Sequence, residues 1–174
     1  MSPLKTLSVF FPCYNEENNI VNTISKAIEV LKSLKLADYE IIVVNDGSQD
    51  YTAEVLDELA RVYAPNVRVI HHAQNCGYGG ALRSGFAAAT KEWLFYTDGD
   101  AQYDPHELKL LAAAMVDGVD IVNGYKIERS DPLHRIIIGR LYQFGVKRMF
   151  GLKLRDVDCD FRLMRRRLFE TVHL

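Results

Sequence analysis

Short apolar runs alternate along the chain with longer stretches in which apolar residues recur every three or four positions. The short runs are rich in β-branched and aromatic residues, which is typical of buried strands. The longer stretches have the spacing of amphipathic helices. The predicted strands are residues 7–12, 39–45, 67–72, 91–98 and 119–124. We expect helices from Glu16, after a cap at Ser48 or Asp50, from Gly77, and from Pro105 to Gly118.

Strands that alternate with helices of this length predict an α/β fold with a mostly parallel sheet covered on both faces. At 174 residues the chain is expected to form a single domain, residues 1–174. In such a sheet, ligands bind at the carboxyl ends of the strands. A polar cluster follows each predicted strand, so we expect these clusters to share one edge: "PCYNEE", "NDGSQD", "NCGYGG", "DGDAQ" and "NGYK".

The acidic stretch 98–104 is the strongest candidate for chemistry. Asp98, Asp100 and Gln102 occupy alternate positions, so in an extended backbone their oxygen atoms point the same way. Oxygen ligands suit Mg²⁺ or Mn²⁺, which take further ligands from phosphates and water. The alternative is a plain turn at the end of a strand. Asp104, just before Pro105, is predicted to cap a helix instead.

Two other strand ends could bind a nucleotide. Asp46 follows a strand and precedes a glycine. It could accept hydrogen bonds from a base or ribose, the role that an acidic strand end has in dinucleotide folds, although a simple turn is equally compatible. Tyr14 could stack on a base. The segment "GYGGAL" departs from the dinucleotide fingerprint because Leu82 stands where its third glycine belongs. We therefore expect these glycines to allow close backbone approach to a ligand.

Composition excludes several classes of protein. A net charge of −2 does not favour binding to nucleic acid. The three cysteines are scattered, which indicates a reducing, cytoplasmic environment and neither a disulfide framework nor a zinc site. The chain shows no signal peptide, and no apolar run approaches the roughly 20 residues of a membrane span.

Residues 133–151 mix apolar and basic side chains in one helical segment. One interpretation is a helix packed on the core with a solvated basic face. The other is a basic amphipathic helix that lies at a membrane surface near anionic lipid.

Five motifs, taken in order, resemble those of the family 2 glycosyltransferases, which have the GT-A fold: "FFPCYNEENNI", "IIVVNDGSQD", "NCGYGGALRSGF", "WLFYTDGDAQYDP" and "DVDCDFRLMRR". Within that family the chain is most similar to the dolichol- or polyprenyl-phosphate sugar synthases, over about residues 7–172. Relatives often continue into transmembrane helices or a second domain.

The resemblance implies a role for each matching residue. The nucleotide-sugar donor would contact Pro12, Tyr14, Glu16, Val44, Asp46 and Asp98. A divalent cation, Mg²⁺ or Mn²⁺, would bind Asp98, Asp100 and Gln102, of which Asp98 and Asp100 form the D-x-D motif. An acceptor phosphate would bind Lys126, Arg135 and Arg162, with Lys126 standing where these synthases usually have arginine. If the acceptor is a hydroxyl instead, Asp158 is the candidate base.

The implied function is the metal-dependent, inverting transfer of a sugar from a UDP- or GDP-sugar to a polyprenyl phosphate at the cytoplasmic face of a membrane. Two alternatives remain open, and a third is disfavoured. The first is a soluble transferase that acts on a protein or polysaccharide hydroxyl. The second is a nucleotide-binding module without catalysis. The third, a sugar nucleotidyltransferase, is disfavoured because its Gly-rich loop belongs where this chain has "PCYNEE".

Overall fold

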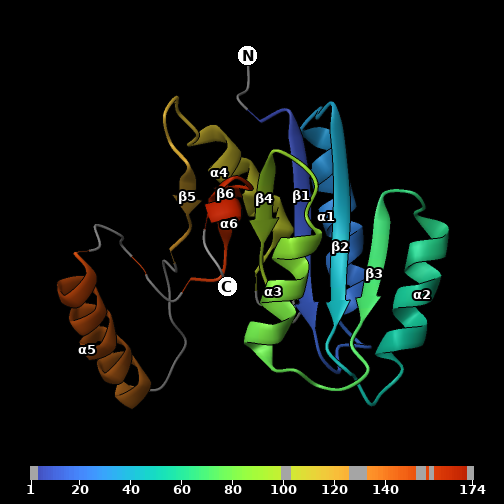
Figure 1. Ribbon diagram of the computed structural model, residues 1–174, viewed down its shortest axis with the longest axis horizontal. Helices are drawn as coiled ribbons and strands as arrows, with labels where there is room; N and C mark the ends of the chain where they lie inside the picture. The colour runs from blue at the N-terminus through green and yellow to red at the C-terminus, as the bar shows by residue number, and fades with distance from the viewer. Residues whose placement is uncertain (1–3, 99–102, 126–132, 152–155, 157–158, 172–174) are drawn as a thin grey trace.

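A six-stranded sheet forms the centre of the computed structural model, with strand order β3-β2-β1-β4-β6-β5 (Figure 1). The structure describes residues 4–98, 103–125, 133–151, 156 and 159–171. The strands are β1 Thr6–Cys13, β2 Asp38–Asn45, β3 Val67–His71, β4 Trp93–Tyr96, β5 Ile121–Asn123 and β6 Arg162–Arg165. The first four are parallel, and β6 runs antiparallel to both β4 and β5. The predicted α/β fold with a mostly parallel sheet is thus confirmed.

Helices cover both faces of the sheet. The helical segments are α1 Ile20–Ser33, α2 Thr52–Val62, α3 Tyr78–Ala88, the short 3₁₀ turn η1 Pro105–Glu107, α4 Leu108–Ala113, α5 Leu133–Phe150 and α6 Leu168–Thr171. Buried side chains of α1, α2 and α4 pack with one set of strand residues, including Val9 and Phe11. Side chains of α3 and α6 pack with the strand residues that alternate with these and point to the opposite face, including Phe10. The alternation of faces along β1 follows from the two-residue period of a strand.

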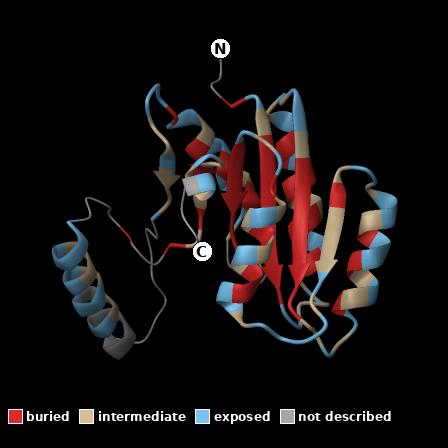
Figure 2. Cartoon of the chain, in the orientation of Figure 1, coloured by how far each residue is buried: buried red, intermediate tan, exposed pale blue. Residues whose placement is uncertain are grey.

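The central strands are almost wholly buried, which explains why they read as unbroken apolar runs (Figure 2). One close approach depends on a glycine. A Cβ atom on Gly85 of α3 would lie 2.2 Å from the Phe10 ring, so any larger residue would push this helix away from β1.

The pairing register places the predicted polar clusters on one edge. Cys13 pairs with Asn45, and Asn45 with His71, so β1, β2 and β3 end together. Arg162 pairs with both Tyr96 and Asn123. Because β6 runs in the opposite direction, it contributes its beginning, rather than its end, to this same edge.

Two sequence predictions of helix bounds were wrong, and one strand was missed. The first helix begins at Ile20 and not at Glu16, because residues 17–19 form a turn in which the amide of Asn19 donates to the Glu16 carbonyl at 3.0 Å. The helix after Pro105 ends at Ala113, short of Gly118. Strand β6 was not predicted at all, because its four residues "RLMR" include two arginines and lack a distinctive period.

The structure confirms some of the predicted helix caps and not others. Asp104 caps its helix, since its side chain accepts a hydrogen bond from the backbone N–H of His106. At the start of α2, Tyr51 occupies the cap position, although Asp50 Oδ1 accepts the N–H of Thr52 at 3.0 Å. Ser48 does not cap α2; its hydroxyl accepts the N–H of Asn15 instead.

Helix α5 stands to one side of the sheet (Figure 1). Its Gln143 donates a hydrogen bond of 2.7 Å to Asp156, which links the helix to the segment before β6. Several large apolar side chains on α5 are 56–78% exposed, namely Ile138, Leu141, Tyr142, Phe144, Met149 and Phe150. Over the described residues, no helix combines the length and apolarity that crossing a bilayer would require.

Candidate functional site

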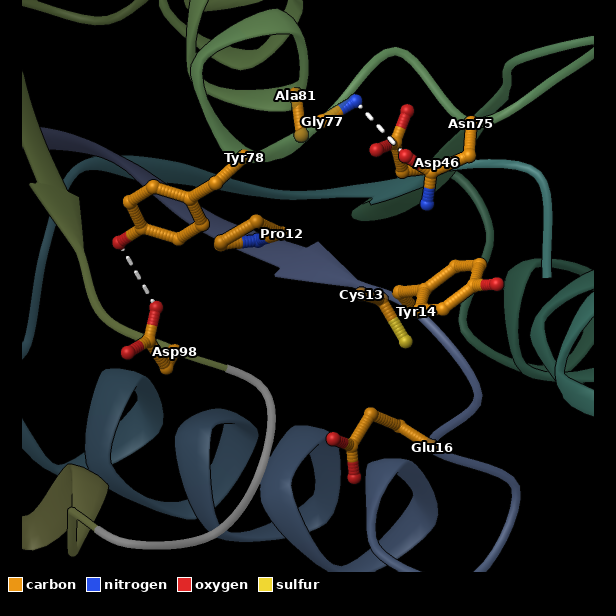
Figure 3. Close-up of a pocket in the computed structure, with 10 residues that line it drawn as sticks. All are labelled: Pro12, Cys13, Tyr14, Glu16, Asp46, Asn75, Gly77, Tyr78, Ala81 and Asp98. Carbon is orange, nitrogen blue, oxygen red and sulfur yellow. Dashed lines mark hydrogen bonds between the residues drawn. The ribbon is translucent and has the colours of Figure 1, made fainter.

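A pocket of about 330 Å³ opens at the carboxyl edge of the sheet (Figure 3). Its walls come from the ends of β1, β2 and β4 and from the loop that leads into α3. The lining residues are Pro12, Cys13, Tyr14, Glu16, Asp46, Asn75, Gly77, Tyr78, Ala81 and Asp98. This is the location expected for a ligand in an open α/β sheet.

Hydrogen bonds between the loops after β1 and β2 stiffen one side of the pocket. The amide of Asn15 donates to Ser48 Oγ at 2.9 Å, and Asn15 Oδ1 accepts the amide of Gln49 at 2.8 Å. The amide of Glu16 donates to Thr52 Oγ1 at 2.8 Å. Each loop therefore satisfies backbone groups of the other, which holds Tyr14 and Glu16 in fixed positions beside the pocket.

Asp46 is 4% exposed and lies at the end of β2. Its Oδ1 atom accepts two hydrogen bonds, from Nδ1 of His72 at 2.6 Å and from the amide of Cys76 at 2.9 Å. A buried carboxylate with both contacts on one oxygen keeps a defined orientation. The second oxygen, Oδ2, receives no hydrogen bond from the residues that the structure describes.

Tyr78 and Asp98 meet across the other end of the pocket (Figure 3). The Tyr78 hydroxyl donates to Asp98 Oδ1 at 2.9 Å. Burial first, and then the negative charges of Asp98 and Asp160, raise the pKa of the Tyr78 phenol well above its usual value. Burial is also the largest cause that raises the pKa of Tyr96, whose hydroxyl donates to Asp160 at 3.3 Å. Both phenols therefore stay protonated and act as donors to carboxylates.

The Cys13 thiol is a pocket group without acid–base chemistry. Burial, with Glu16 and Asp50 as further causes, raises the pKa of Cys13 to about 12. A thiol with this pKa is neutral at physiological pH and is a poor nucleophile. Cys13 therefore contributes shape and polarity to the pocket rather than covalent chemistry.

The side chains at this end of the pocket fit a hard divalent cation. Asp98 supplies carboxylate oxygens, and Asp160 is near enough to act electrostatically on the same phenols, so negative charge concentrates here. Carboxylate oxygen is the donor that Mg²⁺ and Mn²⁺ prefer. The other two predicted ligands, Asp100 and Gln102, lie outside the described residues.

A second group of potential ligands lies on the β2 side. Atoms of Asp46, His72 and Cys76 fall within 4.8 Å of one another, which the spacing of these residues in the sequence did not suggest. Two ligands of one tetrahedral zinc ion, each about 2.1 Å from the metal, are roughly 3.4 Å apart. The Asp46 and His72 atoms are 2.6 Å apart, so the geometry is that of a hydrogen bond between them.

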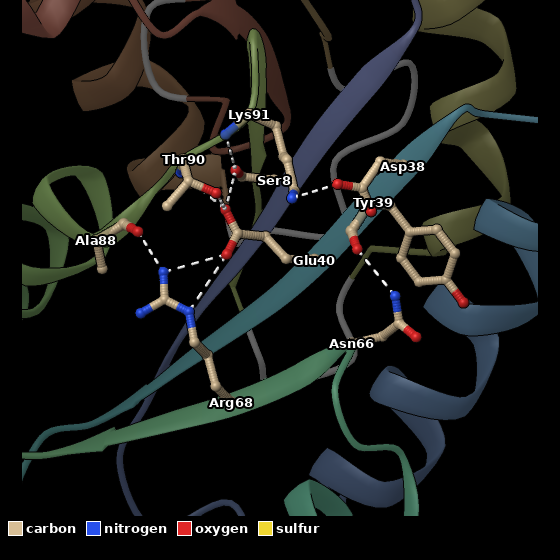
Figure 4. A network of polar contacts seen from close by, with 9 residues as sticks. All are labelled: Ser8, Asp38, Tyr39, Glu40, Asn66, Arg68, Ala88, Thr90 and Lys91. Atoms are coloured by element: carbon tan, nitrogen blue, oxygen red, sulfur yellow. Dashed lines mark hydrogen bonds and ion pairs between the residues drawn. The ribbon is translucent and has the colours of Figure 1, made fainter.

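Another buried carboxylate, Glu40, belongs to the structural framework (Figure 4). Its Oε1 accepts hydrogen bonds from Ser8 and from both the amide and the hydroxyl of Thr90, at 2.6–2.7 Å. Arg68 donates to Oε2. With both oxygens occupied by protein donors, Glu40 joins β1, β2, β3 and the residues before β4, and leaves no oxygen for a ligand.

The structure brings together five of the predicted donor residues, since Pro12, Tyr14, Glu16, Asp46 and Asp98 all line the pocket. Val44 does not line it and is wholly buried among the side chains beneath α3. Arg162 starts β6 at the same edge of the sheet. Arg135 lies in the first turn of α5, with its side chain outside the described part, and Lys126 and Asp158 also fall outside it.

Tyr78, Asn75 and Cys13 line the pocket but were not predicted as site residues. The glycines of "NCGYGG" did indicate that this loop approaches a ligand, and Gly77 has a left-handed φ of 75°. Nothing in the sequence showed that Tyr78 turns toward the acidic cluster 20 residues later. That relationship depends on how α3 packs against the sheet.

Comparison with known proteins identifies relatives along nearly the whole chain. Undecaprenyl-phosphate 4-deoxy-4-formamido-L-arabinose transferase of Pseudomonas fluorescens is 32% identical over 171 residues, which is 98% of this chain and 50% of that protein. The Proteus mirabilis protein of the same name is 29% identical and is covered to 52%. The chain thus spans about half the length of the curated relatives it matches.

Solved structures share the fold at lower identity. A mannosyltransferase from Pyrobaculum calidifontis, in complex with GDP-Man and Mn²⁺, superposes with a TM-score of 0.66 at 19% identity, over 94% of this chain and 45% of that one. Glucosyl-3-phosphoglycerate synthase from Mycobacterium tuberculosis, in complex with phosphoglyceric acid, gives a TM-score of 0.71 at 21% identity, over 94% and 58%. The family model "Glycosyl transferase family 2" matches residues 8–172. The chain therefore belongs to glycosyl transferase family 2.

Proposed function

We propose that residues 1–174 form the catalytic domain of a glycosyltransferase that moves a sugar from a UDP- or GDP-sugar to a polyprenyl phosphate. The observation that carries this proposal is the pocket with Asp46 at one end and Asp98 at the other. A buried carboxylate at the first position suits a nucleobase or ribose, and a carboxylate cluster at the second suits a cation-bound diphosphate. The curated relatives named above are undecaprenyl-phosphate sugar transferases, which supports the choice of acceptor.

Different pocket residues would contact different parts of the donor. Tyr14, 43% exposed at the rim, offers an aromatic face for the base. Asp46 Oδ2 would accept a hydrogen bond from the base, and Glu16 lines the same pocket. Asp98, with Asp100 and Gln102, would hold Mg²⁺ or Mn²⁺. When bound, the cation supplies Lewis-acid stabilisation of the negative charge on the departing nucleoside diphosphate.

The transfer exchanges one C–O bond for another. A phosphate oxygen of the acceptor forms a bond to the anomeric carbon while the bond from that carbon to the donor diphosphate breaks. The electron pair of the broken bond leaves with the nucleoside diphosphate. Attack from the face opposite the leaving group inverts the anomeric centre. Because a phosphate acceptor is already anionic, this step needs no strong general base. With a hydroxyl acceptor, Asp158 would take that role.

Basic residues at the same edge would bind the acceptor. Arg162 begins β6 beside Tyr96, and its Nε donates to the Cys159 carbonyl at 2.9 Å, which orients the guanidinium group. Lys126 follows β5, and Arg135 begins α5. A guanidinium group can bind phosphate through two parallel hydrogen bonds, whereas lysine acts as a point charge.

Helix α5 suits a membrane surface, where a polyprenyl phosphate resides. Ile138, Leu141, Tyr142 and Met149 share one face at helical spacing, and all are exposed. Lys147 and Arg148 lie in its last turn. A helix with exposed apolar and basic residues lies well at an anionic interface. We place the protein at the cytoplasmic face of a membrane, in contact with it through α5.

Nucleotide release and nucleotide binding together test the proposed function. UDP- and GDP-sugars are incubated with the protein, Mn²⁺ and a polyprenyl phosphate, and the released nucleoside diphosphate is measured. We expect release that depends on both the metal and the lipid phosphate. Release with a glycan hydroxyl acceptor instead would reassign the acceptor. Binding of UDP or GDP without release from any donor would indicate a nucleotide-binding module, and neither binding nor release would overturn the proposal.

A further inference from the structure

We propose that His72 and Ser84 are positioning residues that orient Asp46 so that the donor pocket selects bases with a ring N–H donor, namely uracil or guanine. This inference rests on the proposed function, since it concerns the same donor pocket. Neither residue lines the pocket itself. Both act through the Asp46 carboxylate, which does.

Three side chains from separate parts of the fold form a continuous chain of hydrogen bonds. Asp46 follows β2, His72 follows β3, and Ser84 lies in α3. His72 Nδ1 is 2.6 Å from Asp46 Oδ1, and His72 Nε2 is 2.8 Å from Ser84 Oγ. The amide of Cys76 adds a second donor to Oδ1 at 2.9 Å. The imidazole is thus held at both nitrogens, which leaves its ring little freedom to rotate.

The chemistry of these partners determines which nitrogen carries the proton. An ionised carboxylate oxygen only accepts hydrogen bonds, so Nδ1 of His72 must be the donor to Asp46. In the neutral ring, Nε2 then accepts the hydroxyl proton of Ser84. In the protonated ring, Nε2 donates to the same hydroxyl oxygen, which can also accept. In both states Nδ1–H faces Asp46, so Asp46 Oδ1 always has a donor.

The two oxygens of Asp46 therefore have different roles. Oδ1 is occupied by His72 and Cys76, whereas Oδ2 receives no hydrogen bond from the described residues. Glu40, by contrast, has both oxygens occupied by protein donors. Asp46 lines the pocket. With Oδ1 held by these two donors, Oδ2 is the oxygen that remains to accept a hydrogen bond from a ligand.

A hydrogen-bond acceptor in a fixed position distinguishes bases by whether the ring nitrogen that faces it carries a hydrogen. Uracil carries a donor at N3 and guanine a donor at N1. Cytosine N3 and adenine N1 are acceptors, so they would set a lone pair against the carboxylate. An unmatched buried acceptor loses a charged hydrogen bond, and we expect about tenfold to hundredfold weaker binding of the wrong base.

The test compares nucleotides whose bases are alike in size, UDP with CDP and GDP with ADP. Dissociation constants for UDP, CDP, GDP, ADP and ribose 5-diphosphate are measured by calorimetry with Mn²⁺ present, for the wild type and four variants. In the wild type we expect UDP to bind more tightly than CDP, or GDP more tightly than ADP, by about tenfold or more. The variant His72→Leu should reduce that ratio to within about threefold of unity. Its affinity for ribose 5-diphosphate should match the wild type, which also shows that the variant is folded.

Two variants separate positioning from general stability. In His72→Asn the side-chain amide nitrogen takes the place of Nδ1 and keeps the donor to Asp46, so most of the base selectivity should return. Ser84→Ala removes the partner of Nε2 and should lower the selectivity by less than His72→Leu does. His71→Leu is the matched control, because His71 contacts Asn45 and Asp57 and not Asp46.

The possible outcomes are distinct. An unchanged selectivity ratio in His72→Leu would overturn the positioning role, and so would an equal loss of affinity for every ligand including ribose 5-diphosphate. A wild type that binds all four nucleotides equally would overturn the proposed base preference. A wild type that binds none of these ligands would instead refute the donor site and with it the proposed function. If His72→Leu fails to fold, His72→Asn and Ser84→Ala decide between these outcomes.

Discussion

The hydroxyl of Tyr78 lies 2.9 Å from Oδ1 of Asp98 and donates a hydrogen bond to it across the pocket. The two residues are 20 positions apart, one at the start of α3 and the other just after β4. The contact joins the start of α3, on one side of the pocket, to the first carboxylate of the predicted cation site. It therefore orients Asp98 within the pocket.

Replacing Tyr78 with phenylalanine removes this hydrogen bond and keeps the ring. We expect Tyr78→Phe to weaken the Mn²⁺-dependent part of UDP or GDP binding by about threefold to tenfold, the value of one lost hydrogen bond. Binding without metal should be unchanged. Calorimetric titration with and without Mn²⁺ measures both, and Tyr51→Phe, at an exposed tyrosine outside the pocket, is the control. Equal metal dependence in Tyr78→Phe and wild type would contradict this prediction.

Substitution of each carboxylate should separate metal binding from base recognition. Asp98→Asn should abolish most of the thermal stabilisation that Mn²⁺ adds in the presence of UDP or GDP, because a neutral amide is a weaker ligand for a hard cation. Asp46→Asn should keep the metal-dependent shift but lower the preference for UDP over CDP or GDP over ADP. A thermal-shift panel of nucleotides with and without Mn²⁺ measures both effects. The assignments fail if Asp98→Asn retains the full metal-dependent shift.

Gly47 combines two constraints at the edge of the pocket. Its φ is +71°, and a Cβ atom there would lie 2.6 Å from backbone atoms of Gln74 and Asn75. We expect Gly47→Ala to lower the free energy of unfolding by about 2 kcal/mol or more and to weaken nucleotide binding, since it displaces the loop that supplies the Cys76 amide to Asp46.

Gly118→Ala is the matched control for Gly47→Ala. Gly118 has a similar φ of +82°, but a Cβ atom there meets nothing within 4 Å. We expect Gly118→Ala to lower the free energy of unfolding by only about 1 kcal/mol, through backbone strain, and to leave nucleotide affinity unchanged. Urea unfolding and UDP or GDP binding are measured on both variants. Equal losses in the two variants would mean that the contact with Gln74 and Asn75 has no effect of its own.

Glu40 should make the stability of the protein depend on acid pH. Burial alone would raise the pKa of Glu40, but hydrogen bonds from Ser8, Thr90 and Arg68 outweigh it, so the pKa lies below its ordinary value of 4.5. A carboxyl group whose pKa is lower in the folded state stabilises the fold above the unfolded-state pKa, and this contribution is lost as pH falls through the folded-state pKa. In Glu40→Gln this part of the pH dependence should disappear and stability at neutral pH should fall. Urea unfolding between pH 3 and pH 7 tests this, and an unchanged pH profile would contradict it.

Vesicle binding tests the role of α5. Leu141→Glu places a charge on its exposed apolar face and should lower affinity for vesicles containing anionic lipid about tenfold, by loss of buried apolar area and by repulsion. Leu110→Glu is the matched control, since Leu110 is an equally exposed leucine on α4. Sedimentation with vesicles measures both variants. If both variants bind as wild type does, the helix does not contact the membrane.

The sequence by itself determined the parts of this protein that depend on local pattern. The apolar runs that became β1, β2 and β4 are nearly continuous, because strands buried on both faces need apolar residues at almost every position. The polar residues after these strands lie at one edge, because parallel strands end at the same edge of a sheet. For this reason Asp46 and Asp98 could be named as pocket residues in advance. The ordered motifs, over about residues 7–172, also indicated the family, whose model matches residues 8–172.

Only the tertiary structure decided the relationships between residues distant in the chain. Strand β6 exists because β4 and β5 offer edges on either side of a four-residue segment with no strand-like pattern of its own. His72 meets Ser84, and Tyr78 meets Asp98, because α3 packs on the sheet, where Gly85 allows the helix to approach Phe10. Hydrophobic periodicity specifies which face of an element is buried, but it does not specify which side chains meet across the resulting edge. Those contacts depend on strand order and register, and these are set by long-range packing.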